Sequence, residues 1–433
     1  MQYHSLHKTA PDVDFREAVT TGQAPDKGLY FPKEIPHLPK NFIDHLAEIS
    51  KEEIGFTVMK PYVGNSLPDD VLQKIVCETI NFPFPLVHVE ENIFSLELFH
   101  GATYAFKDVG ARFMSRCLGY FNQSSSKKTT ILVATSGDTG GAVASGFLGV
   151  NGVEVIILYP SGKVSPVQEL QLTTCGKNIT ALEVQGNFDD CQAIVKQAFT
   201  DDDLKKKYQL TSANSINVGR WLPQQLYYFF AWQQWQEAEM PVISVPSGNF
   251  GNICAGMLAN ISGLPIKHFI AACNANDVVP KFLQSTIYQP QPSVSTISNA
   301  MDVGNPSNFV RVMELFHQQI KELKKCFSSM SVSDEETKTT IKKVYNDTGY
   351  LLDPHGAVAY KALNDYLQKH KNEKGILLET AHPVKFPDVI ENLLQIKIPV
   401  PENAKSMFAK EKQSILIAAD FDKIKEWMMN RNL

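Results

Sequence analysis

Short apolar runs alternate with amphipathic segments between residues 127 and 210 of the chain. The apolar runs have the length of strands, and between them apolar residues recur at helical spacing. Strands that alternate with helices in this way form right-handed βαβ units around a parallel sheet. The predicted strands are Ile131–Val133, Val155–Leu158 and Thr180–Val184, and the predicted helices are Ser165–Cys175 and Phe188–Phe199.

A second alternating region begins at Val242 and extends into the last third of the chain. Its apolar runs are Val242–Val245, His268–Ala272 and Gly375–Thr380, and we expect them to be strands of a second parallel sheet. The first ninety or so residues instead carry two helix-like segments, Asn41–Glu53 and Asp69–Ile80. The pattern therefore predicts an α/β protein with two parallel sheets.

Lys107 lies in an apolar and aromatic segment, His100–Asp108, just before a helical pattern that starts at Val109. Partial burial and the positive end of a helix both disfavour a protonated amine. A neutral lysine amine forms imines with aldehydes, so Lys107 is a candidate nucleophile. Taken by itself, the segment favours a simpler interpretation, a solvated lysine near a helix start.

The loop Ser247–Gly251 changes that balance. It follows a predicted strand and precedes a small, apolar, helix-like stretch, an arrangement that aims backbone N–H groups and a helix dipole at a phosphate. Gly248 and Gly251 let the backbone approach an anion, and Ser247 and Asn249 add donors. An amine nucleophile with a monophosphate cradle is what pyridoxal 5'-phosphate requires, one covalent tether and one phosphate anchor.

A further glycine loop, Thr135–Gly141, also joins a predicted strand to a predicted helix. A dinucleotide site is the competing interpretation, but the spacing is not G-x-G-x-x-G. The next predicted strand ends in Tyr159–Ser161, without the acidic residue that would bind a ribose. Hydroxyl and N–H groups at a helix start suit a small carboxylate or another phosphate instead.

Bulk properties exclude several classes of protein. A net charge of −5 argues against a nucleic-acid partner, and no apolar run approaches the roughly 18–20 residues that span a bilayer. The seven cysteines are scattered, without a close pair that would suggest a metal site, and their odd number fits reduced thiols. The first residues lack the apolar stretch of a secretory signal. We expect a cytoplasmic enzyme without a metal, a membrane or a nucleic-acid partner.

Six motifs carry a family resemblance: Leu98–Gly101, Phe106–Asp108, Thr135–Gly140, Ser212–Asn217, Ser247–Gly251 and Asn299–Asp302. With them the chain resembles the threonine synthases, pyridoxal-phosphate enzymes of the tryptophan-synthase-β (fold-type II) group, in their bacterial and fungal branch. The resemblance extends from Gly28–Pro32 to Ala381–Pro383. It implies two parallel-sheet α/β domains plus an N-terminal domain. The implied domains are 1–95, then 111–215 as the small α/β domain, and 96–110 with 216–433 as the large cofactor-binding domain.

The resemblance also implies a reaction, the conversion of O-phospho-L-homoserine and water into L-threonine and phosphate by γ-elimination and β-addition of water. Lys107 then tethers the cofactor and is the catalytic proton shuttle. The cofactor phosphate is bound by Ser247, Gly248, Asn249, Phe250 and Gly251. Thr380 faces the pyridine nitrogen, and Asp138 contacts the ring hydroxyl. The structural alternatives are a strand-end threonine that packs in a sheet and a turn aspartate that caps a helix. Many relatives have asparagine at the position of Asp138.

Substrate contacts follow from the same comparison. Thr135, Ser136 and Thr139 are the expected partners of the substrate carboxylate, and Asn217 belongs to a motif expected at the substrate. The substrate phosphate needs cations, and the order of preference is Arg220, Lys163 and Arg112, each with a surface charge as the alternative. His100 and His382 border two motifs, and hydrogen-bonded structural roles are the favoured interpretation for both.

Two other functions stay open at this stage. One is a pyridoxal-phosphate lyase or dehydratase that releases a keto acid, and the other is a non-catalytic relative that binds the cofactor as a regulatory ligand. The intact Lys107 and glycine loops weigh against the second. The sequence leaves the oligomeric state open between monomer and homodimer.

Overall fold

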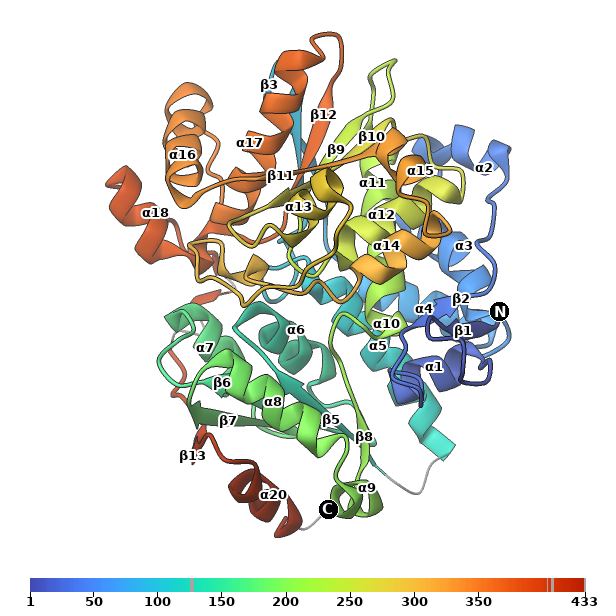
Figure 1. Cartoon of the computed structure of the whole chain (residues 1–433), viewed down its shortest axis with the longest axis vertical. Coiled ribbons are helices and arrows are strands. Elements are labelled where there is room, and N and C mark those ends of the chain that lie inside the picture. Colours follow the sequence, from blue (N-terminus) through green and yellow to red (C-terminus); the bar gives the residue numbers. More distant parts are fainter. Residues whose placement is uncertain (125–127, 403, 406–408, 432–433) are drawn as a thin grey trace. The chain divides into compact units, whose positions relative to one another are not determined.

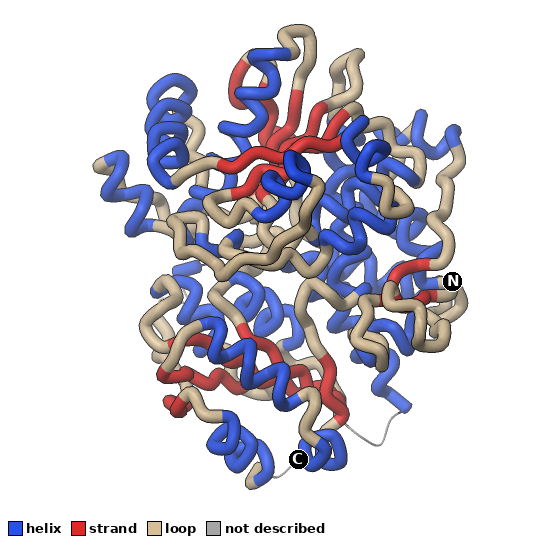
Figure 2. Tube along the Cα trace, viewed as in Figure 1, coloured by secondary structure: helices blue, strands red, loops and turns tan. Residues whose placement is uncertain are grey.

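The computed structural model describes residues 1–124, 128–402, 404–405 and 409–431, and the chain folds into two compact units (Figure 1). The first unit comprises Met1, Phe31–Phe106 and Trp221–Ile398, and the second comprises Gln2–Tyr30, Lys107–Arg220 and Pro399–Leu433. Each unit is therefore assembled from stretches that are far apart in the sequence. Figure 2 shows that the strands of each unit form a sheet flanked by helices.

The first unit contains a six-stranded sheet in the order β11-β10-β9-β12-β4-β3. Neighbouring strands are parallel except for β3, which runs antiparallel to β4. The central strands are buried along almost their whole length, as expected of a sheet covered on both faces. The strands are β3 (Leu86–Glu90), β4 (Ile93–Glu97), β9 (Val242–Pro246), β10 (His268–Cys273), β11 (Phe327–Ser331) and β12 (Gly375–Glu379).

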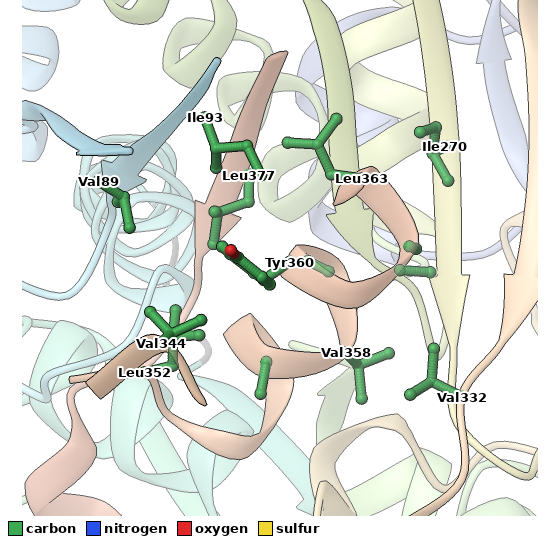
Figure 3. Packing of buried hydrophobic residues seen from close by; sticks show 14 of the residues in the cluster. Val89, Ile93, Ile270, Val332, Val344, Leu352, Val358, Tyr360, Leu363 and Leu377 are labelled. Atoms are coloured by element: carbon green, nitrogen blue, oxygen red, sulfur yellow. The ribbon is translucent and has the colours of Figure 1, made fainter. Parts of the chain in front are cut away.

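One face of this sheet packs against helix α17 (Pro354–Lys369). Asp353 caps the helix by accepting the N–H groups of His355 and Gly356, and Pro354 occupies the first helical position, where its missing N–H costs nothing. Figure 3 shows Tyr360 and Leu363 of α17 beside strand residues of the same apolar cluster. The packing of α17 on this face holds the strands in place, and the candidate site is built at the ends of these strands.

The remaining helices of the first unit surround the sheet. They are α2 (Lys40–Asp44), η1 (Leu46–Glu48), α3 (Lys51–Val63), α4 (Asp69–Thr79), η3 (Leu222–Gln225), α11 (Leu226–Gln234), α12 (Gly251–Ile261), α13 (Val278–Ser285), η4 (Asn299–Met301), α14 (Phe309–Leu315), α15 (Ile320–Cys326), α16 (Asp334–Thr348), η5 (Pro383–Lys385) and α18 (Pro387–Leu394).

The second unit contains a five-stranded parallel sheet in the order β13-β7-β6-β5-β8. Helices α8 and α20 contribute to the apolar cluster on one face, and α6 contacts β6 and the helices α5 and α7. The strands are β5 (Thr129–Ala134), β6 (Val153–Pro160), β7 (Ile179–Gln185), β8 (Gln209–Thr211) and β13 (Ile415–Ala418). The helices are α1 (Phe15–Thr21), α5 (Lys107–Phe121), η2 (Asn122–Ser124), α6 (Asp138–Phe147), α7 (Pro166–Thr173), α8 (Phe188–Ala198), α9 (Asp202–Lys207) and α20 (Phe421–Met429). Strand β1 (Tyr3–Ser5) also belongs to the second unit, and two short elements, β2 (Tyr30–Pro32) and α10 (Val218–Trp221), cross the boundaries in the sequence between the units.

The predicted strands and the helices near Ser165, Phe188 and Asp69 are confirmed, with ends that shift by one or two residues. The single helix predicted over Asn41–Glu53 is wrong. The segment contains α2, η1 and the start of α3, because Ser50 is extended and its hydroxyl caps α3 by accepting the N–H of Glu53 at 3.2 Å. Serine competes with the helical backbone in this way wherever it can cap a new helix.

The three-domain division into 1–95, 111–215, and 96–110 with 216–433 stays a prediction. The compact units differ from it in several places, and the expected N-terminal domain is divided, with Gln2–Tyr30 in the second unit and the stretch from Phe31 onward in the first. Strand β4 (Ile93–Glu97) contains the boundary at residue 95 and pairs with β12, so the end of the expected N-terminal domain lies in the large sheet. Strand β13 pairs with β7, which brings the C-terminal stretch into the second unit. Within the residues that the structure describes, no helix has the length and apolar character needed to cross a membrane.

Candidate cofactor site

Three adjacent parallel strands of the six-stranded sheet end at the same edge, and all three lead into expected site residues. Strand β9 leads into the loop Ser247–Gly251, β12 into Thr380, and β4 into the segment that precedes Lys107. Strands β9 and β12 are in register through Ile243 and Ile376. The carboxyl edge of an open α/β sheet is where ligands bind in such folds.

The loop Ser247–Gly251 passes from strand to helix in five residues. Ser247 continues the sheet by donating its N–H to the carbonyl oxygen of Ala272 at 2.8 Å. Phe250 has φ +60°, a left-handed conformation that turns the chain into α12, which begins at Gly251. The first N–H groups of α12 have no carbonyl partner within the helix and are the donors that an anion satisfies.

Gly248 lies in close contact with another backbone segment. A Cβ on Gly248 would lie 2.6 Å from the Cα of Met301 and 3.2 Å from the carbonyl oxygen of Ala300. Since both neighbours are backbone atoms, a side chain fits only if one of the two segments moves. A glycine at position 248 is predicted because it lets the backbone approach an anion. The contact of Gly248 with the backbone of residues 300 and 301 is a second reason for a glycine at this position.

The side chains of the loop point largely into the protein. The Ser247 hydroxyl donates to the carbonyl oxygen of Val245 at 2.8 Å, and the Asn249 Oδ1 accepts the N–H of Ser307 at 2.6 Å. Phe250 is buried, with its ring centroid 5.5 Å from that of Phe309. Backbone N–H groups therefore carry more of the expected phosphate binding than the side chains do.

Asn252, which follows the loop, is a further candidate site residue that sequence patterns do not single out. Its carbonyl oxygen and its Oδ1 both accept from the hydroxyl of Tyr228, at 3.0 and 2.9 Å. Its side-chain nitrogen is buried and has no acceptor among the residues that the structure describes. A buried donor in the first turn of α12 fits a site that binds an anion such as a phosphate. The only sequence signal is an asparagine within an otherwise apolar helix start.

The segment before Lys107 is held across the strand ends. Phe106 donates its N–H to the carbonyl oxygen of Thr380 at 2.9 Å and accepts the hydroxyl of Tyr227. The buried Lys385 ammonium donates to the carbonyl oxygen of Thr103 at 2.9 Å. Lys107 is the next residue along the chain, half-buried, and it is the first residue of α5. The predicted helix is confirmed and begins at the lysine itself.

Thr380 and the two nearby histidines take different roles. Thr380 is 5% exposed and directly follows β12. His100 pairs with Glu97 through a 2.7 Å contact, while His382 Nδ1 accepts the N–H of Val384 at 3.0 Å and so caps η5. Burial lowers the pKa of His382 to about 4, and the neighbouring His100 contributes to the lowering. These contacts support the structural interpretation of both histidines.

In the second unit, the loop after β5 is organised by Thr135. Its hydroxyl accepts the N–H groups of Gly137 and Gly140 at 3.0 and 2.9 Å, and donates to the carbonyl oxygen of Gly137. Asp138 is 5% exposed, and its Oδ1 accepts the amide of Gln168 at 2.9 Å. Thr135 and Asp138 thus hold the loop in shape.

Ser136 and Thr139 of the same loop are only half-buried. Their hydroxyls are therefore the accessible ones in this loop, and they are the loop side chains best placed to meet a substrate carboxylate.

The cationic candidates differ in exposure. Lys163 is exposed in the turn after β6, and Arg112 is half-buried on α5. Arg220 is 2% exposed, donates to the carbonyl oxygen of Ala213, and packs its backbone on Gly110.

Asn217, three residues before Arg220, is fully buried. Its amide donates to the carbonyl oxygens of Val19 and Ser212 at 2.9 and 3.2 Å, and its Oδ1 accepts the N–H of Gly219 at 2.9 Å. Asn217 and Arg220 both hold neighbouring segments of the second unit together. Both side chains are buried whereas that of Lys163 is exposed, a difference that sequence patterns do not reveal.

Comparison with known proteins identifies the family. The profile described as "Pyridoxal-phosphate dependent enzyme" matches residues 81–379, and those described as "Threonine synthase N terminus" and "Threonine synthase, C-terminal" match residues 2–80 and 356–428. The chain belongs to the threonine synthase family. It is 44% identical to a threonine synthase of Serratia marcescens over 99% of both chains.

Solved threonine synthases have the same fold. The structure from Escherichia coli has a TM-score of 0.92 at 43% identity and covers all of both chains. The pyridoxal-phosphate-bound structure from Brucella melitensis has a TM-score of 0.91 at 34% identity, over 99% of this chain and 98% of that one. The predicted fold-type II class is confirmed, and pyridoxal phosphate is the cofactor of this family. The cradle at Gly248, the start of α12 and the buried donor of Asn252 fit the phosphate of that group.

Proposed function

We propose that the chain converts O-phospho-L-homoserine and water into L-threonine and phosphate, the last step of threonine biosynthesis. The observation that carries the proposal is the shared edge of β9, β12 and β4. There one sheet supplies a phosphate cradle, Thr380 and the anchored segment that leads to Lys107. Membership of the threonine synthase family supports the choice of substrate and product.

Lys107 Nζ is the proposed tether for the cofactor aldehyde and, once the substrate amine has taken its place, the group that moves protons at the substrate carbons. Bound pyridoxal phosphate supplies an electron sink for negative charge on the amino-acid carbons. The hydrogen bonds of Phe106 fix the backbone from which Lys107 extends to the residue that follows β12, and a fixed backbone limits the positions that the amine can take.

The proposed phosphate site of the cofactor consists of Ser247, Gly248, Asn249, Phe250 and Gly251. Backbone N–H groups at the start of α12 bind the anion, and Asn252 adds its buried side-chain nitrogen. Thr380 is the proposed partner of the pyridine nitrogen. A hydroxyl there does not force protonation of that nitrogen, as a carboxylate would. Asp138 stays the proposed contact of the ring hydroxyl, and its hydrogen bond to Gln168 orients it.

For the substrate, Ser136 and Thr139 are the proposed carboxylate contacts, with Thr135 shaping their loop. Lys163 is the proposed partner of the substrate phosphate because its side chain is exposed and of the cationic type that binds phosphate. Asn217, in the motif Ser212–Asn217, and the nearby Arg220 stay proposed substrate contacts, although both side chains are buried and bonded within the second unit. The Arg220→Lys variant separates a substrate contact from a structural residue.

The deciding experiment incubates the purified chain and pyridoxal phosphate with O-phospho-L-homoserine. It follows phosphate release and resolves the organic products by NMR. Threonine formed in step with phosphate supports the proposal. Lys107→Ala should abolish both products and the absorbance of the bound cofactor, while Lys343→Ala, which removes an exposed lysine on α16, should change neither.

Other outcomes separate the alternatives. Phosphate accompanied by 2-oxobutyrate and ammonia would move the assignment to a phospho-lyase. Cofactor absorbance that disappears in Lys107→Ala, without turnover of any phosphorylated amino acid by the unmodified chain, would indicate a non-catalytic binding protein.

The proposed location is the cytoplasm, supported by the seven cysteines, all of which are free thiols in the structure. Small metabolites are the proposed partners, and the proposed assembly is a monomer or a homodimer. Light scattering during size-exclusion chromatography decides between the two.

A further inference from the structure

The short helix η4 (Asn299–Met301) packs against the loop Ser247–Gly251, the proposed phosphate cradle, on the side of Gly248. Its backbone is the segment that approaches Gly248, with a Cβ on the glycine placed 2.6 Å from the Met301 Cα. The Met301 side chain is 3% exposed and belongs to the apolar core of the first unit. Any displacement of η4 therefore moves Gly248 or opens a gap beneath it.

His355, at the start of α17, holds η4 in place. Its Nε2 accepts the backbone N–H of Ala300 at 3.2 Å, and its Nδ1 lies 2.5 Å from the Oδ1 of Asp353. Because Nε2 accepts, the proton of the neutral ring must be on Nδ1, where Asp353 accepts it. The two hydrogen bonds are compatible only in this tautomer.

Asp353 is itself held by Glu379, the last residue of β12. The N–H of Asp353 donates to the Oε1 of Glu379 at 2.7 Å, and Glu379 directly precedes Thr380. The side chains of Glu379 and Asp353 are fully buried and that of His355 is 2% exposed. A continuous series of hydrogen bonds thus runs from Glu379 through Asp353 and His355 to Ala300, joining the end of β12 to η4.

We propose that His355 is a positioning residue for the cofactor phosphate: it holds the Ala300 N–H, and through η4 it sets the position of Gly248. Asp353 keeps His355 in the tautomer that accepts. The proposal rests on the proposed phosphate role of the loop Ser247–Gly251. The proposed role is indirect, because the hydrogen bond of His355 reaches η4 and not the loop Ser247–Gly251.

Two substitutions separate the hydrogen bonds of His355. In His355→Gln the side-chain oxygen can occupy the place of Nε2 and accept from Ala300, whereas in His355→Asn the shorter amide can reach only Asp353. Both remove the ring and its packing on Phe386, whose centroid lies 5.0 Å away. The pair therefore isolates the contact to η4 from the general loss of packing.

The test is a titration of the full chain, freed of cofactor, with pyridoxal phosphate and separately with pyridoxal, followed by cofactor absorbance. Pyridoxal keeps the aldehyde and lacks the phosphate. His355→Asn should raise the dissociation constant for pyridoxal phosphate about tenfold, because η4 loses the hydrogen bond that holds it against Gly248, and should raise that for pyridoxal less than about twofold. His355→Gln should stay within about threefold of the unmodified chain for both ligands.

One further variant keeps the test decisive. Gly248→Ala changes the cradle directly and should also weaken pyridoxal phosphate selectively. If Gly248→Ala is selective but His355→Asn is not, the positioning role of His355 is overturned and the cradle stands.

Equal weakening of both ligands by His355→Asn, or equal behaviour of the Asn and Gln variants, would also overturn the positioning role. If Gly248→Ala leaves the preference for pyridoxal phosphate unchanged, the cradle fails and the role of His355 fails with it.

Discussion

The backbone N–H of Phe106 donates to the carbonyl oxygen of Thr380 at 2.9 Å. This bond joins the residue before Lys107 to Thr380, which directly follows β12 and whose side chain we propose faces the cofactor ring. Thr380 therefore has two separable functions, a backbone acceptor that orients the lysine segment and a hydroxyl for the pyridine nitrogen. A side-chain substitution removes only the second.

Thr380→Val should accordingly lower kcat/KM about five- to tenfold, the loss expected for one hydrogen bond, with the free energy of unfolding nearly unchanged. Thr380→Ser keeps the hydroxyl and should retain most of the activity. Steady-state kinetics with the absorbance spectrum of the bound cofactor measures both. Equal activity of the Val and Ser variants would remove Thr380 from the cofactor site.

Thr135 and Ser136 are neighbours with opposite expected effects. Thr135→Val leaves the N–H groups of Gly137 and Gly140 without their acceptor and should lower the free energy of unfolding by about 2–4 kcal/mol. Ser136→Ala removes a half-buried hydroxyl and should leave that free energy within about 0.5 kcal/mol while raising KM. Urea unfolding and steady-state kinetics test the pair, and a stable Thr135→Val would contradict the structural role.

Lys163 and Arg220 can be compared as phosphate partners. Lys163→Ala should raise KM for the phosphorylated substrate about tenfold without loss of stability, because the side chain is exposed. Arg220→Lys should lower the free energy of unfolding by about 1–3 kcal/mol, since the lysine loses the guanidinium contact to Ala213 in a buried site. A stable Arg220→Lys with a raised KM would reverse the order of preference.

Glu379 should make stability fall as the pH rises. Its pKa is well above the usual range because it is buried and because the carboxylate of Asp353 lies beside it. The folded protein therefore holds a proton that the unfolded chain releases above about pH 4.5, so the free energy of unfolding decreases above that pH and up to the folded pKa. Glu379→Gln keeps a neutral side chain and should remove this part of the pH dependence. If the free energy of unfolding changes equally with pH in both proteins between pH 5 and pH 8, Glu379 is ionised in the folded protein.

Glu183 should have the opposite effect in acid. Burial raises its pKa, but hydrogen bonds from Lys412, Ser161 and Ser414 outweigh burial and lower the pKa to about 2. Its contribution is complete above the unfolded value near 4.5 and is lost as the pH falls toward 2. Between pH 6 and pH 3.5 the unmodified chain should lose about 1–2 kcal/mol that Glu183→Gln does not lose. Urea unfolding of the unmodified chain and of Glu183→Gln at both pH values measures this difference in the free energy of unfolding.

Features that depend on neighbouring residues in the sequence are predictable. Strands β5, β6, β7, β9, β10 and β12, the helix at Lys107 and the glycine loop before α12 follow from the spacing of apolar residues and from local turn chemistry, and the structure has all of them. The same patterns do not predict the other strands of the two sheets, β3, β4, β8, β11 and β13. The six motifs mark the family because they combine several such local signals. Lys107 and Gly248 can therefore be inferred from the residues that flank them.

Contacts between distant parts of the chain are not predictable in this way. Nothing local to Phe106 indicates that it bonds to Thr380, and the burial of Asn217 and Arg220 depends on Val19 and Gly110, far away in the sequence. The helix break at Ser50 is not predictable from the spacing of apolar residues, because that spacing stays helical on both sides of the serine that caps α3. Exposure and partners, rather than residue type, separate Lys163 from Arg220.

The pairing of β13 with β7 has a consequence for how the protein is made. Strand β13 begins at Ile415, after the last segment of the first unit has ended at Ile398, yet it completes a sheet whose other strands were synthesised more than two hundred residues earlier. Pairing across such a separation is slow, because the chain must close a long loop before the contact forms. On the ribosome the edge of β7 therefore stays uncovered until synthesis is almost finished. During that interval an open parallel edge is the surface at which two nascent chains would associate.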